Sequence, residues 1–340
     1  MYSILFRPEA TDLQISSVRR HLMNGGAAAV DLLTDGDRRV IVFDDPAGLL
    51  DLAAVGEMPG VESLPTGRLK NSRVAEAVDS GDFDSGITGL TVIAGPCGIE
   101  SEEQTSAIFS ALAREGLRFV RGGAYKPRTS PHDYQGPGAD GLVMASQIAA
   151  DFGLQLVSEI VDPRDVEFAV RHVAMIQIGT RSMQNFPLLK EAGMSGLPIL
   201  LKRGMSATVE EWIGAAEHAL EAGAASVIFC ERGIRTFESA TRNTLDILGA
   251  AALKEKTRLR VIADPSHAAG RRSLVAQGAR AAIAAGLDGV IVEVHHDPAS
   301  ARSDAAQALP LVEFSGLMRS IRSIHEALNA DIEPLGTVLP

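Results

Sequence analysis

Residues 90–101, LTVIAGPCGIES, join a continuous apolar run to a polar turn and a helix-start signal. The run LTVIA shows no alternation of polar and apolar residues, which is typical of a strand buried on both faces of a sheet. Ser101, followed by Glu, Glu and Gln, has the form of a capping box. Ile108, Phe109 and Leu112 then fall on one face of a helix. The stretch therefore predicts a strand, a turn and a covering helix.

The same unit recurs along the rest of the chain. Apolar runs begin near residues 90, 118, 155, 174, 198, 226, 260 and 289, with helical spacing between them. Strands that alternate with helices build a parallel sheet covered by those helices. Eight units over residues 90–340 predict an α/β fold of the (β/α)8 TIM-barrel class. A doubly wound open sheet is the alternative, but it normally has fewer strands and a glycine fingerprint after the first, which IAGPCGIES is not.

Residues 1–64 have a different texture and predict a small separate domain. Strands and helices are expected, in order, at residues 2–7, 12–23, 27–33, 38–43, after Pro46 and near Val61. Asp-Gly within residues 34–37, TDGD, is a hairpin signal between two strands. The order βαββαβ predicts a ferredoxin-like sandwich. Residues 65–89 are polar and are expected to form a linker to the barrel, residues 90–340.

Composition and charge exclude several classes of protein. A hydrophobic content of 46% and a charged content of 22% are ordinary for a soluble globular protein. Net charge -11 and a pI near 5.3 argue against nucleic acid or an anionic membrane as a partner. The start lacks the apolar core of a signal peptide, and no run is long enough to span a membrane. Two cysteines form no disulfide framework, so we expect a cytoplasmic protein.

The catalytic and binding residues of a barrel lie at the carboxyl ends of its strands. In this sequence, polar residues follow each apolar run. One set is cationic and is expected to form a bowl for several anionic groups: Arg121, Lys126, Arg128, Arg181, Lys202 and Arg232. A second set offers sulfur, nitrogen and oxygen donors: Cys97, His267, Glu293 and Asp304. Such donors fit Mn, Fe, Co or Zn better than Mg or Ca. The alternative for each single Cys or His is a packing role.

Residues 122–131, GGAYKPRTSP, carry two of these cations in one loop. Proline fixes the backbone and glycine opens it, so the loop can hold Lys126 and Arg128 in one orientation for a phosphate or carboxylate. A charged surface turn is the alternative interpretation. Two other residues are assigned to packing: Cys230, inside an apolar run, as a core thiol, and Trp212 as a half-buried helix residue.

Eight motifs in this order resemble those of 3-deoxy-arabino-heptulosonate 7-phosphate (DAHP) synthases. They are AGPCGIES, GGAYKPRTSP, IQIGTRSMQNF, LLKRG, CERGIRTFE, TRNTLDI, DPSHAAGRR and IVEVH, and they extend from Leu90 to about Ala327. The subgroup with an N-terminal ferredoxin-like domain is the most similar, although residues 1–64 resemble it only in element order. KPRTS separates this family from sister enzymes that make the eight-carbon 3-deoxy-octulosonate 8-phosphate.

The resemblance implies the condensation of phosphoenolpyruvate with erythrose 4-phosphate, with release of phosphate, at the entry to the shikimate pathway. It places metal ligands on Cys97, His267, Glu293 and Asp304, with Mn as the expected metal. It places phosphoenolpyruvate contacts on Arg121, Lys126, Glu159, Arg181, Lys202 and Arg232, and on the backbone N–H of Thr180. It places aldose-phosphate contacts on Lys126, Pro127, Arg128 and Thr129. Asp264 is counted among the substrate-binding residues, and Lys126, Cys97 and His267 among the catalytic ones.

The sequence departs little from the family pattern. Thr180 stands where alanine is common, and Gly98 and Ile99 replace a common Ser-Val, which leaves every expected ligand in place. We expect Lys126, pressed among other cations, to have a lowered pKa that suits proton transfer.

Two other functions and one regulatory role follow from the same reading. The alternatives are a sister sugar-acid phosphate synthase that uses another aldose and a non-catalytic relative that only binds metabolites. The resemblance further implies a homo-oligomer, a dimer or tetramer. It also implies that residues 1–64 bind tyrosine or phenylalanine and inhibit the barrel. The alternative for this domain is a role in oligomer assembly alone.

Overall fold

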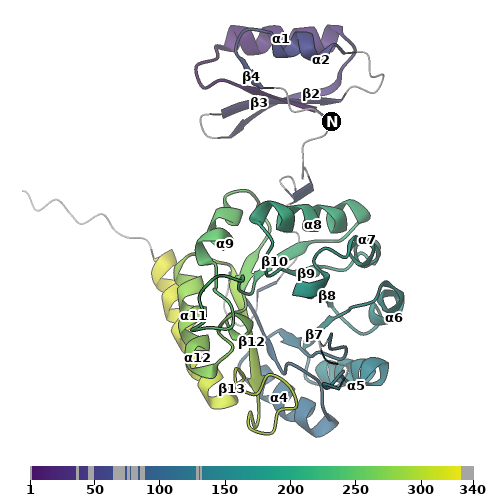
Figure 1. Cartoon of the computed structure of the whole chain (residues 1–340), viewed down its shortest axis with the longest axis vertical. Helices are drawn as coiled ribbons and strands as arrows, with labels where there is room; N and C mark the ends of the chain where they lie inside the picture. The colour runs from purple at the N-terminus through teal and green to yellow at the C-terminus, as the bar shows by residue number, and fades with distance from the viewer. Residues whose placement is uncertain are drawn as a thin grey trace, which may run out of the picture. The chain divides into compact units, whose positions relative to one another are not determined.

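The computed structural model describes residues 2–35, 38–44, 50–63, 73–74, 77, 83–84, 89–127, 130 and 132–330. The chain divides into two compact units, Met1–Ser72 and Arg73–Pro340 (Figure 1). Most of the expected linker, residues 65–89, and the middle of the expected hairpin turn, residues 36–37, lie outside the described residues. Among the described helices, none combines the length and the apolar character that crossing a membrane requires.

The first unit is a four-stranded antiparallel sheet with two helices on one face (Figure 1). Its elements are β1 (Tyr2–Phe6), α1 (Asp12–Asn24), β2 (Ala28–Asp35), β3 (Arg38–Asp44), α2 (Leu52–Gly56) and β4 (Val61–Ser63). The strands lie in the order β2-β3-β1-β4, so β1 and β3 occupy the centre. Helix α1 begins at a capping box made by Thr11 and Gln14. The predicted βαββαβ arrangement is confirmed.

The second unit is a closed barrel of eight parallel strands. They are β5 (Thr91–Gly95), β6 (Phe119–Arg121), β7 (Gln155–Glu159), β8 (Met175–Ile178), β9 (Ile199–Lys202), β10 (Val227–Glu231), β11 (Val261–Ala263) and β12 (Gly289–His295). Neighbours in sequence pair in space, and the pairing of β11 with β12 closes the sheet. Each strand begins within one residue of its predicted start. The TIM-barrel prediction is confirmed.

Helices surround the barrel and alternate with its strands (Figure 1). They are α4 (Glu102–Arg114), α5 (Gly138–Asp151), α6 (Val166–Ala169), α7 (Phe186–Met194), α8 (Val209–Ala222), α9 (Ile247–Lys254), α10 (Pro265–Ala269), α11 (Arg272–Ala284) and α12 (Leu311–Asn329). Two 3-10 turns, Pro163–Asp165 and Thr180–Ser182, follow β7 and β8, and β13 (Leu309–Pro310) pairs with β12.

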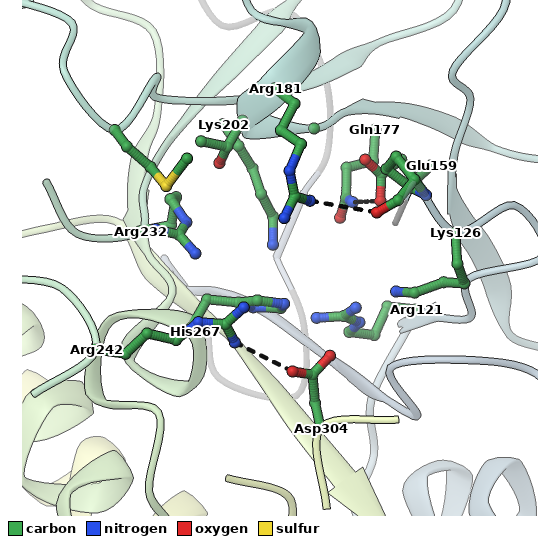
Figure 2. A pocket seen from close by; sticks show the side chains of 14 residues that line it. Arg121, Lys126, Glu159, Gln177, Arg181, Lys202, Arg232, Arg242, His267 and Asp304 are labelled. Carbon is green, nitrogen blue, oxygen red and sulfur yellow. Dashed lines mark hydrogen bonds and ion pairs between the residues drawn. The ribbon is translucent and has the colours of Figure 1, made fainter. Parts of the chain in front are cut away.

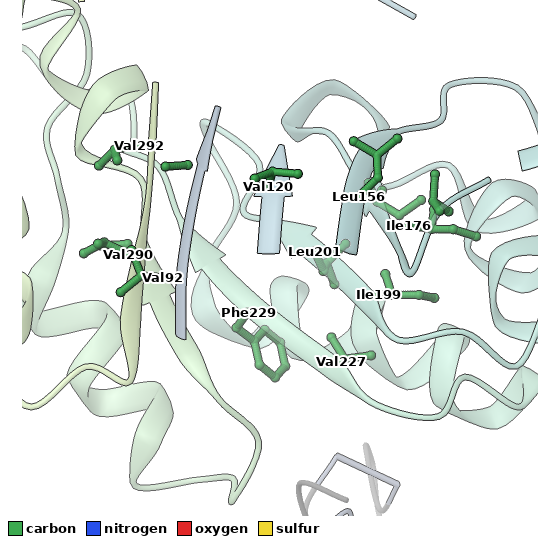
Figure 3. Packing of buried hydrophobic residues seen from close by; sticks show 14 of the residues in the cluster. Val92, Val120, Leu156, Ile176, Ile199, Leu201, Val227, Phe229, Val290 and Val292 are labelled. Atoms are coloured by element: carbon green, nitrogen blue, oxygen red, sulfur yellow. The ribbon is translucent and has the colours of Figure 1, made fainter. Parts of the chain in front are cut away.

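Alternate residues of each strand supply two apolar layers. Outward residues such as Val92, Val120 and Leu201 pack with the helices (Figure 3). Inward residues such as Ile93 and Ile228 fill the barrel. This period of two follows from the strand pleat, and it explains why the runs are apolar throughout. Both faces of the sheet are buried, so the polar residues gather beyond its ends.

Two local predictions need correction. Ser101 caps α4 by accepting from Gln104 N at 3.1 Å, but Gln104 Oε1 accepts from Glu100 N at 3.1 Å, not from Ser101 N, so the capping box is only half formed. Trp212 is fully buried because α8 packs over the sheet, and its indole N–H donates to Leu201 O at 3.1 Å. The half-buried assignment was wrong. The prediction of a core thiol is confirmed, because Cys230 is fully buried inside the barrel.

Described residues between 73 and 84 contact the barrel. The backbone N–H groups of Arg73 and Val74 each donate to the carboxylate of Glu217 at 2.9 Å. Phe83 is buried in the inner cluster, with its ring centroid 6.2 Å from that of Phe119, at the amino end of β6. Val74 and Phe83 therefore belong to the hydrophobic core of the barrel.

We predict that Phe83→Ala destabilises the barrel by about 3 kcal/mol, because it leaves a cavity among inward side chains. Urea unfolding of the full chain, followed by Trp212 fluorescence, measures the change. Phe237→Ala is the matched control, since Phe237 is 101% exposed, and it should leave the unfolding free energy unchanged. Equal effects of the two substitutions would contradict a packing role for Phe83.

Candidate active site

A pocket opens at the carboxyl ends of the barrel strands, and charged side chains from many strands converge on it (Figure 2). Its lining residues are Arg121, Lys126, Pro127, Glu159, Gln177, Gly179, Thr180, Arg181, Lys202, Met205, Arg232, Arg242, His267 and Asp304. They come from β6 through β12 and from the loops that follow these strands. The structure thus gathers at one end of the barrel residues that lie up to 183 positions apart in sequence.

Cys97, His267, Glu293 and Asp304 form a group that we call the four-donor cluster. One possible ligand atom from each residue lies within 4.8 Å of the others. Cys97 Sγ lies 2.9 Å from Asp304 Oδ2, and His267 Nε2 lies 3.3 Å from Glu293 Oε1. Cys97 follows β5, His267 lies on α10, Glu293 lies in β12 and Asp304 in the loop after it. The cluster therefore depends on the pairing of β12 with β5 on one side and with β11 on the other.

The four-donor cluster fits a divalent cation. Glu293 Oε1 is buried, and it is among the few buried polar atoms of the described residues that have no hydrogen-bond partner. Burial and the neighbouring Glu293 raise the pKa of Cys97 to about 12, so a thiolate here needs a nearby positive charge. A bound cation would satisfy both groups. Sulfur, imidazole and carboxylate donors together favour a transition metal.

Asp264 holds one member of the cluster and one cation of the pocket at the same time. Its Oδ2 lies 2.7 Å from His267 Nδ1 and accepts from Lys202 Nζ at 2.5 Å, and its Oδ1 accepts from His267 N at 2.9 Å. An Nδ1–H donated to Asp264 leaves the lone pair of Nε2 facing the cluster. Although burial opposes the charge, His267 and Lys202 hold the pKa of Asp264 well below its usual range. Asp264 itself is fully buried.

Lys126 and Arg121 are buried beside the cluster. Lys126 Nζ donates to Cys97 O at 2.8 Å and lies 3.0 Å from Cys97 Sγ. Burial opposes its charge, but Cys97 and Glu159 outweigh burial and raise the pKa of Lys126. The expected lowering of this pKa was wrong, because these acidic neighbours, remote in sequence, outweigh the other cations. Arg121 Nη2 lies 3.4 Å from Glu293 Oε1, while its Nε and Nη1 are buried and have no partner among the described residues.

The remaining cations point into the same space (Figure 2). Arg232 Nη1 donates to Asn243 Oδ1 at 2.7 Å, and burial lowers the pKa of Arg232. Arg181 Nη1 donates to Pro127 O at 3.3 Å and so connects β8 to the loop that carries Lys126. Together with Arg121, Lys126 and Lys202, these side chains make a strongly cationic cavity. Such a cavity can bind several anionic groups at once.

Glu159 is an acidic residue among the cations that line the pocket. Gln177 Nε2 donates to Glu159 Oε2 at 3.4 Å. A Cβ at position 179 would lie 1.8 Å from Glu159 Oε1, so glycine is required for the carboxylate to lie there. Thr180 begins the 3-10 turn directly after Gly179 and lines the pocket. Arg128 and Thr129, the other expected loop residues, lie outside the described residues.

Gln177 and Arg242 line the pocket but were not among the residues predicted from the sequence. Gln177 lies inside the apolar run of β8, so a search of the residues after each strand could not find it. Arg242 lies in TRNTLDI, where the motif itself was the only signal, and its Nη1 lies 3.1 Å from Asp304 Oδ1. Arg203, which follows β9, and Glu231, which ends β10, do not line the pocket but form a buried ion pair at 2.9 Å.

Comparison with known proteins agrees with this geometry. A sequence profile of the DAHP synthetase I family matches residues 81–329. The chain belongs to this family. It is 43% identical over 255 residues to the phospho-2-dehydro-3-deoxyheptonate aldolase of Thermotoga maritima, which covers 75% of each protein. The 2-dehydro-3-deoxyphosphooctonate aldolase of Syntrophotalea carbinolica is 30% identical over 262 residues, 72% of this chain and 94% of that protein.

The solved structure of the Thermotoga maritima DAHP synthase superposes with a TM-score of 0.72 at 36% identity, and the match covers 96% of this chain and 98% of that one. A truncated form of that DAHP synthase matches 70% of this chain, with a TM-score of 0.66 and 41% identity. These matches extend the DAHP synthetase I assignment from the motifs to the three-dimensional fold.

We predict that Asp264→Asn destabilises the demetallated protein by about 3 kcal/mol at pH 7, because buried Lys202 loses its counter-charge. The lowered pKa of Asp264 means that its contribution is fully present above about pH 4 and is lost as the pH falls below that value. The Asn variant should therefore lose less stability on acidification. Urea unfolding between pH 3 and 7 measures both effects. Asp151→Asn, at the exposed end of α5, is the control, and parallel curves for all three proteins would contradict the prediction.

Proposed function

We propose that this chain catalyses the metal-dependent condensation of phosphoenolpyruvate with erythrose 4-phosphate. The products are 3-deoxy-arabino-heptulosonate 7-phosphate and inorganic phosphate, and the reaction is the first step of the shikimate pathway. One observation carries the proposal: the four-donor cluster, in which Cys97 and Glu293 are buried, lies beside buried Arg121, whose Nε and Nη1 lack partners among the described residues. Two phosphorylated substrates, one of them also a carboxylate, need such a surface. Membership of the DAHP synthetase I family supports the same reaction.

Phosphoenolpyruvate would bind deep in the pocket. The groups proposed to hold its phosphate and carboxylate are Arg121, Lys126, Arg181, Lys202, Arg232 and the backbone N–H of Thr180. The Nε and Nη1 of Arg121 have no partner among the described residues, so each has an N–H group available to donate to a carboxylate or phosphate. Glu159 would face carbon 2 of the substrate, where water adds. Asp264 would contribute indirectly, by holding Lys202 and His267 in place.

Erythrose 4-phosphate would lie between the loop after β6 and the four-donor cluster. We assign its phosphate to Lys126, Pro127, Arg128 and Thr129. The bond from Arg181 to Pro127 O supports this placement, because it holds the loop against the same cavity. Carbon 3 of phosphoenolpyruvate would attack the aldehyde carbon of this second substrate. Holding two anions in register is itself a large part of catalysis.

Cys97, His267, Glu293 and Asp304 would hold the metal, for which we propose Mn over Fe, Co or Zn. The bound metal supplies a Lewis acid for the aldehyde oxygen of erythrose 4-phosphate. Lys126 has a raised pKa and is protonated at neutral pH, so its Nζ would donate a proton rather than accept one. Its position 3.0 Å from Cys97 Sγ places that proton beside the cluster.

We predict that the demetallated chain releases no phosphate from its two substrates and that Mn²⁺ restores the reaction. Erythrose 4-phosphate should be a better substrate than arabinose 5-phosphate in the same assay. Cys97→Ala should weaken metal binding, whereas Cys230→Ala, which removes a thiol from the inner core, should not. Phosphate release and chelator-competition titrations measure these effects. Full activity without metal would refute the metal requirement, and preference for arabinose 5-phosphate would favour the sister synthases.

We further propose that residues 1–64 form a regulatory domain joined to the barrel, residues 90–340, through residues 65–89. The unit Met1–Ser72 has a hydrophobic core of its own. Tyrosine or phenylalanine would bind it in a homo-oligomer, a dimer or a tetramer, and would favour an inhibited arrangement. An effector can act only if it binds that arrangement more tightly than the active one. The alternative is a role in assembly alone.

We predict that a chain starting at Ser72 stays active and loses inhibition by tyrosine or phenylalanine, which should inhibit the full chain. The shorter chain keeps Val74, Phe83 and the other residues that contact the barrel. Initial rates with and without each amino acid test the regulation, and light scattering of both chains tests assembly. Equal inhibition of the two chains would place the effector site on the barrel.

A further inference from the structure

Gln307 lies outside the pocket but contacts the four-donor cluster. It is 2% exposed, in the loop between β12 and β13. Its Nε2 donates to Glu293 Oε2 at 2.6 Å, and its Oε1 accepts from Arg242 Nη1 at 3.3 Å. The same Nη1 of Arg242 donates to Asp304 Oδ1 at 3.1 Å (Figure 2). A chain of polar contacts therefore joins the two carboxylates of the cluster from outside.

In each of the two carboxylates, one oxygen contacts Gln307 or Arg242 and the other faces the four-donor cluster. Glu293 uses Oε2 for Gln307, while its Oε1 lies 3.3 Å from His267 Nε2. Asp304 uses Oδ1 for Arg242, while its Oδ2 lies 2.9 Å from Cys97 Sγ. In both residues one oxygen is held by an outer donor and the other faces the cluster. We infer that Gln307 and Arg242 are positioning residues that orient Glu293 and Asp304 for a metal ion.

The backbone of the loop supports this inference. Asp304 has a φ of 54°, in the left-handed region that residues other than glycine seldom adopt. Gln307 N donates to Asp304 O at 3.1 Å, which closes a turn, and the loop then joins β13 beside β12. The turn brings Asp304 over the cluster and places the amide of Gln307 against Glu293. Left-handed backbone of this kind persists where surrounding contacts over-determine it.

The chemistry of the two side chains fits this division of tasks. Glutamine donates to Glu293 without adding charge, so the carboxylate keeps its full negative charge for a cation. Arg242 adds a positive charge on the outer side of Asp304, which stabilises the loop before a cation binds. Outer hydrogen bonds to ligating side chains fix their orientation, and their loss typically weakens metal binding about 10- to 100-fold.

The inference rests on the proposed metal site, so the experiment begins with the unsubstituted chain. We would demetallate the full chain and titrate it with Mn²⁺ and Co²⁺ against a chromogenic chelator, and would record the thiolate-to-cobalt absorption that reports on Cys97. Gln307→Met keeps the size of the side chain and removes its amide. We expect this variant to bind both ions about 10- to 100-fold more weakly. The KM for phosphoenolpyruvate at saturating metal should stay unchanged, because Gln307 does not line the pocket.

Two further variants separate orientation of the carboxylates from general loosening of the loop. Arg272→Met is the matched control: Arg272 Nε donates to Ala308 O at 2.8 Å in the same loop but touches neither carboxylate. It should bind metal as the unsubstituted chain does. Arg242→Met should weaken metal binding, and combining it with Gln307→Met should weaken binding by less than the product of the two single effects, as expected for coupled residues. Should Gln307→Met fail to fold, Gln307→Leu also removes the amide that donates to Glu293, without adding a charge.

Three results would overturn the inference, and they are distinguishable. If Gln307→Met, or Gln307→Leu in its place, binds metal as tightly as the unsubstituted chain, Gln307 does not position Glu293. If Arg272→Met weakens binding equally, the effect belongs to the loop as a whole. If the unsubstituted chain binds neither Mn²⁺ nor Co²⁺, or binds Co²⁺ without thiolate-to-cobalt absorption, the proposed metal site is wrong. The proposed metal requirement is then wrong as well.

Discussion

The structure of the pocket depends on holding several positively charged side chains close together in a mostly buried site, although their charges repel one another. Arg121, Lys126 and Lys202 are each at most 9% exposed and face one cavity. Charges repel strongly in such surroundings, and an unpaired buried charge is costly. Each cation is therefore matched by an acidic group, Glu293 for Arg121, Glu159 for Lys126 and Asp264 for Lys202. The N–H groups that remain free on Arg121 are available for an anion.

Asp264 makes the anion site and the cation site interdependent. One carboxylate oxygen contacts both Lys202 Nζ and His267 Nδ1, so the ammonium that faces the cavity and the imidazole of the four-donor cluster share a partner. In a low-dielectric network of this kind, a charge added at one point changes the interactions at the others. A cation at the cluster would strengthen the attraction of the whole cavity for anions. If the two sites bind as proposed, Asp264 would link the two binding events through Lys202 and His267.

The sequence predicted the fold well because each barrel strand can be recognised from a few consecutive residues. An apolar run of about five residues followed by polar residues is a short-range signal, and every strand began within one residue of its expected position. The residues after the runs, such as Cys97 and His267, were brought together as expected. The pKa of Lys126 was misjudged because its sign depends on Cys97 and Glu159, whose proximity is a tertiary fact. Gln177 and Gln307 were missed for a related reason: an uncharged amide carries no signal until its partner is known.

Glycines at the carboxyl ends of the barrel strands show that the role of a glycine cannot be predicted from its neighbours in sequence alone. Gly95 ends β5 with a φ of 154°, and a Cβ there would lie 1.9 Å from Arg121 O. Gly179 gives the same room to Glu159. In a doubly wound sheet, glycines after a strand let the backbone approach a pyrophosphate. Here they let neighbouring strands and side chains approach one another, so that Arg121 at the end of β6 lies against the end of β5, just before Cys97. Glycine follows a strand in both folds. In the doubly wound sheet a ligand approaches it, whereas in this barrel Arg121 O and the Glu159 carboxylate do so, and only the three-dimensional structure distinguishes the two cases.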